Sequence, residues 1–332
     1  MSQVFKPRLL IVRAIFPEVL ARLEQSFDVE SNQEDIVLSP AELAGRLQGK
    51  QAALTTTADR IDAALLAACP NLKICANMAV GTNNFDLPAM AIRGVAATNT
   101  PDVLTETTAD FGFALMMATA RRISEGEAYL RAGRWTKWGY DLLAGSDIHG
   151  ATLGILGMGR IGQGIAKRGA LGFGMKVIYH NRSRLSAERE TECQASYVSK
   201  DALLQTADHL VLVLPYSAAA HHAIGAAELA QMKPTATLVN IARGGIVDDA
   251  ALAQALREKR IAAAGLDVFE GEPKVHPALL TVPNVVLTPH IASATMGTRL
   301  AMATLAADNL IGYLLHGKPL TPINPQVMGS LK

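Results

Sequence analysis

The chain is poor in cysteine and carries no metal-binding motif. Its 332 residues include three cysteines, Cys69, Cys75 and Cys193, an odd number without CxxC spacing. Neither an HExxH sequence nor a run of clustered cysteine and histidine is present. A disulfide framework and a metal site are therefore not expected, and the cysteines are predicted to be the reduced thiols of a cytosolic protein.

An excess of charge of one sign is also lacking. Charged residues make up 18% of the chain and sum to a net charge of +1, which leaves no electrostatic footprint for nucleic acid or an acidic membrane surface. The uncharged stretch His209 to Ala227 contains Pro215 and three histidines, so it is a poor membrane span. No N-terminal segment shows the pattern of an export signal. We therefore expect a cytoplasmic protein with no nucleic-acid or membrane partner.

What the chain does have is a glycine turn between a strand and a helix. An apolar run, Leu153 to Leu156, precedes the turn, a helical pattern follows to about Leu171, and a second apolar run covers Lys176 to Tyr179. The turn consists of Gly157, Met158, Gly159, Arg160, Ile161 and Gly162. In such a unit the glycines allow a tight turn, close approach to a pyrophosphate and close helix packing, and the phosphates bind at the helix N-terminus. The segment predicts a dinucleotide site.

The corner after the second run indicates which dinucleotide binds. NAD sites usually place a carboxylate about 20 residues beyond the turn, where it binds the ribose 2′-hydroxyl. Here the corner instead offers Asn181, Arg182, Ser183 and Arg184. Two guanidiniums and a hydroxyl can bind a 2′-phosphate, so NADP(H) is predicted to be preferred, with NAD(H) as the second coenzyme. The alternative interpretation is a solvated basic turn.

The chain length predicts two domains, and both show alternating strands and helices, which is typical of parallel sheets covered by helices. In the first hundred residues we expect strands at 8–12, 52–55, 72–76 and 95–97, and helices at 17–25, 40–47 and 62–68. After the glycine unit we expect strands at 210–214, 236–240, 262–267 and 285–288, and helices at 202–205, 227–232 and 249–259. The second domain would thus hold a six-stranded, doubly wound sheet. A last helix, 301–316, is expected to pack on the first domain.

One long apolar segment lies between the two predicted domains of alternating strands and helices. Residues 104 to about 130 are predicted to form a single helix. Its apolar residues exceed what one face needs, so it could contribute to a subunit interface, although burial within the chain is the default interpretation.

Three reactive side chains follow predicted strands. Arg243 follows the strand ending at Asn240, Glu272 follows the strand ending near Asp267, and His290 follows the strand ending near Thr288. The carboxyl ends of strands are where open α/β sheets bind ligands. A guanidinium can hold a carboxylate, an imidazole can protonate a carbonyl oxygen, and a carboxylate can orient that imidazole, which suits reduction of a 2-keto acid.

Each of these three residues also has a simpler interpretation. Arg243 could cap a helix or form an ion pair, Glu272 could be a surface acid, and His290 could be a buried, hydrogen-bonded histidine. Spacing alone does not decide between the two sets of roles.

At these residues the sequence resembles the D-isomer-specific 2-hydroxyacid dehydrogenase family, and the likeness spans nearly the whole chain. Besides the glycine turn, the matching segments are MAVGTNNFDL (78–87), TPDVLTE (100–106), NIARGGIVD (240–248), GLDVFEGEP (265–273) and TPHIAS (288–293). The resemblance implies that Arg243 binds the 2-keto acid, His290 donates a proton and Glu272 supports His290. His221, His222 and His276 match no family role and are interpreted as surface residues.

The resemblance also implies further contacts. The backbone at Val80 and Gly81 would bind the substrate carboxylate, and Pro215 would lie against the adenosine. The residues flanking the nicotinamide would be Thr105, Ile241, Asp267 and Ser293. The implied architecture has a flavodoxin-like substrate domain of residues 1–100 and 293–332, a Rossmann domain of residues 101–292, and an active site in the cleft between them.

The leading hypothesis is an NADPH-dependent reductase of small 2-keto acids, with glyoxylate, hydroxypyruvate and 2-ketogluconate as open alternatives. The basic corner (180–184) and the segment RWTKW (134–138) most resemble the glyoxylate/hydroxypyruvate reductase branch of the family. The resemblance to the family also implies a homodimer formed through the nucleotide-binding domains. Trp138 either reaches the neighbouring active site or packs in the interface. A coenzyme-sensing co-repressor on the same scaffold is a second hypothesis. An NAD-dependent dehydrogenase is a third, which the acid-free corner disfavours.

Overall fold

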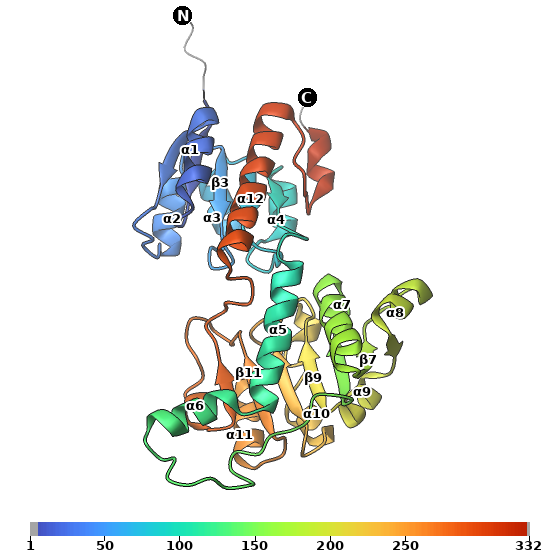
Figure 1. Ribbon diagram of the computed structural model, residues 1–332. Helices are drawn as coiled ribbons and strands as arrows, with labels where there is room; N and C mark the ends of the chain where they lie inside the picture. The colour runs from blue at the N-terminus through green and yellow to red at the C-terminus, as the bar shows by residue number, and fades with distance from the viewer. Residues whose placement is uncertain (1–5, 331–332) are drawn as a thin grey trace, which may run out of the picture. The chain divides into compact units, whose positions relative to one another are not determined.

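The computed structural model describes residues 6–330 and divides into two compact units. One unit consists of Met1–Leu104 and Thr295–Lys332, and the other of Thr105–Ala294. Each contains one parallel sheet with helices on both faces, which confirms the predicted α/β class (Figure 1). Within the described part of the chain, no helix is both long and apolar enough to cross a bilayer.

The first unit holds five parallel strands in the order β2-β1-β3-β4-β5. The strands are β1 (Arg8–Ile11), β2 (Asp28–Ser31), β3 (Ala52–Thr55), β4 (Ile74–Asn77) and β5 (Ala96–Thr98). The helices are α1 (Pro17–Ser26), α2 (Pro40–Leu47), α3 (Ala63–Ala68), α4 (Leu87–Ile92) and α12 (Met296–His316). Helices α1 and α12 cover one face of the sheet, and α2, α3 and α4 cover the other. Strands β3 and β4 are buried along their whole length, which explains their unbroken apolar character.

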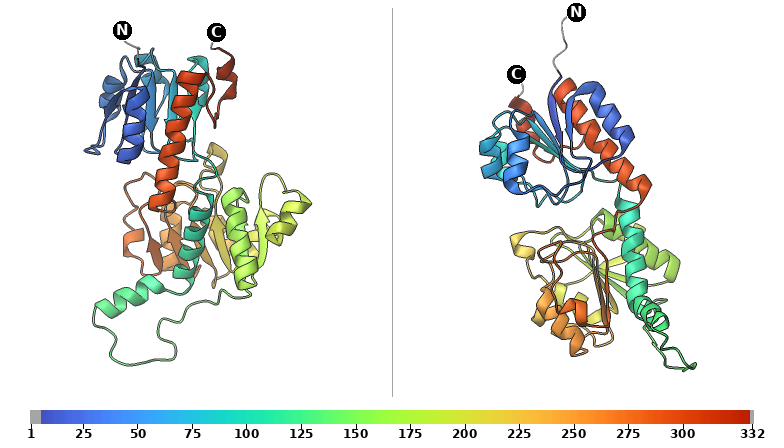
Figure 2. Two further views of the ribbon diagram at one scale, coloured as in Figure 1. Left: turned by 45° about the horizontal axis from the view of Figure 1, so that its top comes forward. Right: turned by 90° about the vertical axis from the view of Figure 1, so that its left-hand side faces the viewer.

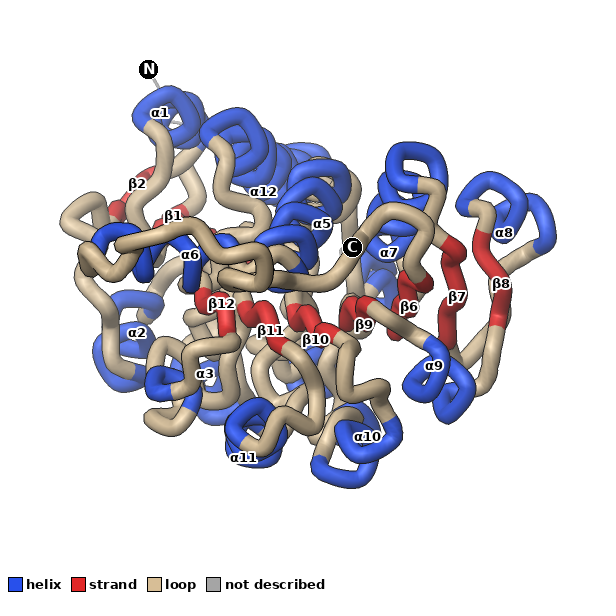
Figure 3. Tube along the Cα trace, turned by 60° about the horizontal axis from the view of Figure 1, so that its bottom comes forward, coloured by secondary structure: helices blue, strands red, loops and turns tan. Residues whose placement is uncertain are grey.

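The second unit holds seven parallel strands in the order β12-β11-β10-β9-β6-β7-β8 (Figure 3). The strands are β6 (Thr152–Leu156), β7 (Lys176–His180), β8 (Ala195–Tyr197), β9 (His209–Leu212), β10 (Thr237–Asn240), β11 (Ala263–Leu266) and β12 (Val285–Leu287). The helices are α5 (Thr105–Ala120), α6 (Ile123–Arg131), α7 (Arg160–Lys167), α8 (Ala187–Cys193), α9 (Lys200–Thr206), α10 (Ala226–Gln231) and α11 (Asp249–Arg257). Helices α5 and α7 pack on one face, and α9, α10 and α11 on the other.

The predicted six-stranded sheet is wrong by one strand, because β8 was not expected. Strand β8 has three residues and lies at the edge of the sheet, paired only with β7. Strand β2, with the polar sequence DVES, was missed for the same reason. An edge strand is covered on fewer sides, so its side chains need not form the apolar run by which central strands are recognised. The short helices α4 and α8 were also missed.

The single helix predicted for residues 104–130 is also wrong, because the chain breaks between α5 and α6. Arg122 adopts a left-handed conformation with φ of 53°, and its guanidinium forms two hydrogen bonds with Glu125 in the first turn of α6. The carbonyl of Ala120, the last residue of α5, accepts a hydrogen bond from the Ser146 amide. These local polar contacts thus end the helix at residue 120, although the apolar pattern in the sequence continues beyond it.

Candidate active site

The loops at the carboxyl ends of the strands form the candidate site of the second unit. Strand β6 pairs with β7 on one side and with β9 on the other, so the strand order reverses direction between β6 and β9. Open α/β sheets bind ligands at such a reversal, outside the carboxyl ends of the strands. The predicted dinucleotide turn follows β6 at this point, and Pro215 lies in the loop that follows β9.

The three glycines of the turn differ in what a side chain would meet. Gly157 has φ of 102°, and a Cβ there would lie 2.6 Å from the backbone nitrogen of Leu214. A Cβ at Gly162 would lie 2.5 Å from the Gly157 carbonyl oxygen. At Gly159 a Cβ would meet no protein atom within 4 Å, so packing within the protein does not require glycine there. Gly159 is the glycine whose backbone is expected to approach a pyrophosphate. It is also the N-cap of α7, and no side chain of this residue caps the first amides of the helix, so they can bind a phosphate. The turn therefore fits a dinucleotide.

The predicted 2′-phosphate corner is only partly available to a ligand. Asn181 is hydrogen-bonded to the glycine turn, because its Oδ1 accepts a 2.6 Å hydrogen bond from the Met158 amide. The Arg184 guanidinium binds Glu190 through two hydrogen bonds of 2.8 Å each. Together with the Tyr179 hydroxyl, that guanidinium lowers the pKa of Glu190 to about 2. Arg182 is exposed, with no side-chain partner among residues 6–330.

Arg243 lies in the loop after β10, pressed against the loop after β11. The close approach depends on Gly244, where a Cβ would overlap with the Phe269 carbonyl. The Arg243 Nη1 donates a 2.6 Å hydrogen bond to the Ala242 carbonyl. Burial lowers the pKa of the Arg243 guanidinium, while the neighbouring Glu272 carboxylate opposes this shift. An arginine remains charged despite such a shift, so a partly desolvated cation faces this edge of the sheet.

Glu272 and His290 are in direct contact, from the loops after β11 and β12. The His290 Nδ1 lies 2.8 Å from Glu272 Oε2, and Glu272 Oε1 accepts a 2.9 Å hydrogen bond from the Phe269 amide. Burial alone would raise the pKa of Glu272, but the hydrogen bond and charge of His290, the Phe269 amide and Arg243 together lower it. The His290 Nε2 has no hydrogen-bond partner among the described residues, so it is the ring nitrogen that remains available.

Asp267 holds the loop that carries His290, which the sequence did not reveal. One carboxylate oxygen accepts hydrogen bonds of 2.8 Å from the Ile291 amide and the Thr288 hydroxyl, and the other accepts 2.9 Å from the Ala292 amide. Burial raises the pKa of this carboxyl group. His290 itself has φ of 54°, a conformation that this set of hydrogen bonds supports. The signal available in the sequence was an aspartate at the end of a predicted apolar strand, and the structure shows that this aspartate is fully buried.

The remaining residues predicted to contact coenzyme or substrate lie on both units. Thr105 begins α5, Ile241 is buried after β10, and Ser293 lies in the loop beyond His290. In the first unit, the Val80 and Gly81 carbonyls follow β4 and accept 2.9 Å hydrogen bonds from the side chains of Asn99 and Asn77. These bonds fix the loop, and its contact with a substrate stays a prediction.

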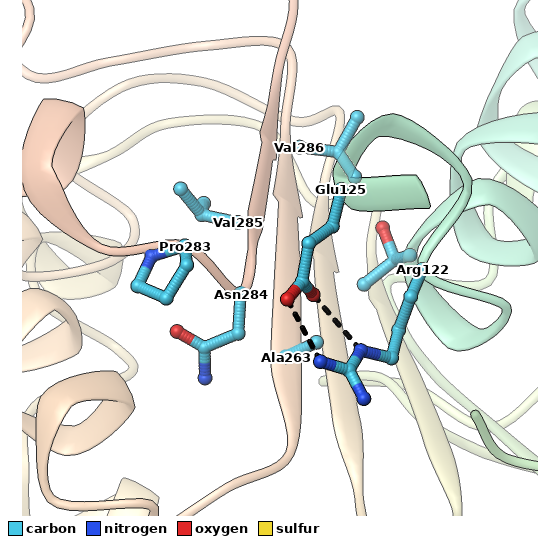
Figure 4. A pocket seen from close by; sticks show the side chains of 8 residues that line it. Arg122, Glu125, Ala263, Pro283, Asn284, Val285 and Val286 are labelled. Carbon is cyan, nitrogen blue, oxygen red and sulfur yellow. Dashed lines mark hydrogen bonds and ion pairs between the residues drawn. The ribbon is translucent and has the colours of Figure 1, made fainter. Parts of the chain in front are cut away.

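A surface pocket in the second unit, whose lining residues Figure 4 shows, lies at the opposite ends of the strands from the reactive side chains. It is lined by Thr119, Arg122, Glu125, Ala263, Pro283, Asn284, Val285 and Val286. Ala263 begins β11 and Val285 begins β12, so the pocket lies at the amino ends of these strands. Ligands of such sheets bind at the carboxyl ends, and the pocket is therefore not a candidate active site.

Comparisons with known proteins identify the family. Residues 113–292 match the NAD binding domain of the D-isomer specific 2-hydroxyacid dehydrogenases. The chain is 45% identical to a glyoxylate reductase of Thermococcus onnurineus over 331 residues, covering 98% of each chain. It is also 45% identical to a glyoxylate reductase of Aeropyrum pernix over 329 residues, covering 97% of each chain.

A solved structure of similar sequence and fold supports the same family assignment. The NADPH-dependent glyoxylate/hydroxypyruvate reductase of Sinorhizobium meliloti, in complex with NADP and malonate, is similar with a TM-score of 0.86 and 36% identity. The match covers 97% of this chain and 98% of that one. The motifs, the two parallel sheets and these likenesses agree, and the protein belongs to the D-isomer specific 2-hydroxyacid dehydrogenase family of NAD(P)-dependent enzymes.

Proposed function

We propose that the protein reduces small 2-keto acids to D-2-hydroxy acids, with glyoxylate and hydroxypyruvate as substrates and 2-ketogluconate as a further candidate. The observation that carries this proposal is the 2.8 Å contact between His290 Nδ1 and Glu272 Oε2 beside the Arg243 guanidinium. The curated relatives named glyoxylate reductase support the choice of substrate.

The three side chains have separate roles in this reaction. A bound nicotinamide cofactor supplies the hydride. The Arg243 guanidinium binds the substrate through its planar set of donors and polarises the keto group. The His290 Nε2–H donates a proton to the keto oxygen as hydride reaches the carbon. Glu272 holds Nδ1 and stabilises the positive charge of the imidazolium before the proton leaves.

The activity is tested by following NADPH oxidation with glyoxylate, hydroxypyruvate and 2-ketogluconate. Wild-type protein should oxidise NADPH with at least one of these acids, and Arg243→Ala should abolish turnover. Arg243→Lys keeps the charge but loses the planar fork of donors, so it should restore only a small part of kcat/KM. His276→Ala, at an exposed position outside the site, is the matched control. Protein that binds coenzyme but oxidises neither NADPH nor NADH with any of the acids would contradict the proposal and favour a coenzyme-sensing role.

We further propose that NADPH is preferred over NADH, through Arg182 and Ser183 more than through Arg184. Arg182 has no side-chain partner in the described part of the chain, whereas Arg184 is bound to Glu190. Arg182→Ala should therefore raise KM for NADPH roughly tenfold, or about 1.4 kcal/mol, and leave KM for NADH nearly unchanged. Arg184→Ala should raise KM for NADPH less. An equal effect of Arg182→Ala on both coenzymes would indicate a solvated basic turn instead.

We also propose a homodimer formed through the second unit. Helix α5 buries eight residues within the unit, whereas α6 buries none. Large apolar side chains are exposed on α6 and the loop after it, namely Ile123, Leu130, Trp135, Trp138, Tyr140 and Leu142. Figure 2 shows this segment projecting from the rest of the unit. Light scattering should give the mass of a dimer for wild type and of a monomer for Trp138→Glu combined with Tyr140→Glu, and monomeric wild-type protein would contradict the proposal.

A further inference from the structure

Two histidines and a glutamate that the proposed reaction does not use meet near the loop after β11. His221 and His222 follow a short 3-10 helix, Ala218–Ala220, and Glu270 lies 48 positions along the chain. The His222 Nε2 lies 2.9 Å from Glu270 Oε2, and the His221 Nε2 lies 3.9 Å from Glu270 Oε1. The two imidazole rings are stacked, with centroids 3.9 Å apart. One nitrogen of each ring therefore faces the same carboxylate.

The backbone holds the two histidines in this arrangement. His222 has φ of 49°, and its amide donates a 2.7 Å hydrogen bond to the Gly245 carbonyl. Two residues later, Ile224 forms a parallel bridge with Val247. The backbone around both histidines is thus hydrogen-bonded to the segment between β10 and α11. These backbone contacts, in addition to the stacking of the two rings, fix the position of the histidines.

The second nitrogen of each ring faces a polar group of its own. The Tyr216 hydroxyl lies 3.2 Å from His221 Nδ1. The Asp248 Oδ2 lies 3.8 Å from His222 Nδ1, while its Oδ1 caps α11 by accepting the Ala250 and Ala251 amides. Outer partners of this kind fix the orientation of metal-binding histidines in known sites.

We propose that His221 Nε2, His222 Nε2 and a Glu270 oxygen bind one divalent transition-metal ion of the zinc type. The three residues each offer a ligand atom within 4.8 Å of the other two. A tetrahedral ion with bonds of about 2.0–2.1 Å needs ligands about 3.3 Å apart, and side-chain rotation can supply the shift. Two imidazoles favour zinc, cobalt or nickel over magnesium or calcium, which prefer oxygen ligands. The side chains are partly exposed, so a water can complete the coordination.

Such an ion would join two loops and stabilise the folded unit. Glu270 lies two residues before Glu272, and its amide donates a 3.1 Å hydrogen bond to the buried Asp249 carboxylate. Metal binding would therefore fix the start of the loop that carries Glu272. Because the ion binds the folded arrangement and not the unfolded chain, it should raise the melting temperature.

The test uses tag-free, full-length protein treated with a chelator and then titrated with Co²⁺, followed by visible absorption. Wild type should bind about one equivalent with the intense bands of a tetrahedral site, and Zn²⁺ should displace the cobalt. Glu270→Gln and His221→Gln should each weaken binding at least about tenfold. Tyr216→Phe, which removes only an outer partner and keeps the packing, should also weaken it. His276→Gln is the control and should bind as wild type does.

Melting temperatures in the chelator separate loss of metal binding from loss of folding. A variant that melts as wild type does without metal, but gains no stability with Zn²⁺, supports the proposal. Absence of cobalt bands in wild type would overturn it and would leave a hydrogen-bonded histidine cluster. Undiminished binding in both Glu270→Gln and His221→Gln would equally overturn it.

Discussion

The loop after β11 carries two glutamates, each in contact with a histidine from another loop, and the two pairs differ in which ring nitrogen of the histidine remains available. Glu270 and Glu272 lie on either side of Gly271, and their histidines are at 2.9 Å and 2.8 Å. His222 and His290 both have left-handed backbone, with φ of 49° and 54°. Glu272 binds Nδ1 of His290 and leaves Nε2 available, whereas Glu270 binds Nε2 of His222.

The groups around each pair decide what it can do. Glu272 also accepts a hydrogen bond from the Phe269 amide and lies near the Arg243 guanidinium, so its pair combines an imidazole with a nearby cation, as the proposed reduction requires. Glu270 meets a second imidazole instead of a guanidinium. The same short contact therefore supports the proposed proton transfer in one place and the proposed metal binding in the other.

The largest expected effect comes from removing the imidazole of each pair in turn. His290→Ala should lower kcat for 2-keto acid reduction about 10² to 10⁴-fold, because a positioned general acid contributes about that much. His222→Ala, assayed in chelator, should lower kcat by no more than a few fold. Steady-state assays on both variants make the comparison, and similar losses in both would remove the distinction between the two pairs.

Replacing the two glutamates should also lower kcat more at Glu272 than at Glu270, but by less than replacing the histidines. Glu272→Gln keeps the size of the side chain but removes the charge that supports the imidazolium, and kcat should fall about 10 to 100-fold, or about 1.4–2.7 kcal/mol. Glu270→Gln in chelator should lower kcat much less. If KM rises and kcat is unchanged in Glu272→Gln, the residue binds substrate and does not support His290.

The sequence predicted the parts of this site that depend on regular spacing. The glycine turn, the strand that precedes it and the helix that follows were recognisable because each has its own pattern, and Arg243, Glu272 and His290 because each follows an apolar strand. The contact between His290 and Glu272 was inferred from chemical roles, and the structure places their atoms 2.8 Å apart.

Contacts set by turns and loop conformations could not be predicted in this way. The sequence does not show that Arg184 binds Glu190 and so is less available to a 2′-phosphate, because that contact depends on how α8 follows β7. Nor does it show that His222 meets Glu270, since 48 residues separate them. Adjacent histidines without a family role were interpreted as surface residues, and only the fold brings a carboxylate to them.

The smallest expected effect is on stability at acidic pH, and it concerns the Glu272 pair. The pKa of Glu272 is lowered in the folded protein, because the contributions of His290, the Phe269 amide and Arg243 outweigh burial. A carboxyl group with a lowered folded pKa stabilises the protein above its unfolded pKa, near 4.5, and this contribution is lost as pH falls through the folded pKa. About a third of the side chain is exposed, so the contribution should not exceed about 1 kcal/mol. Thermal unfolding of wild type and Glu272→Gln between about pH 7 and pH 3 measures this contribution. The wild type should have the higher melting temperature at neutral pH, and the difference between the two proteins should shrink below about pH 4.5. A difference that grows as pH falls would contradict this account of the pair.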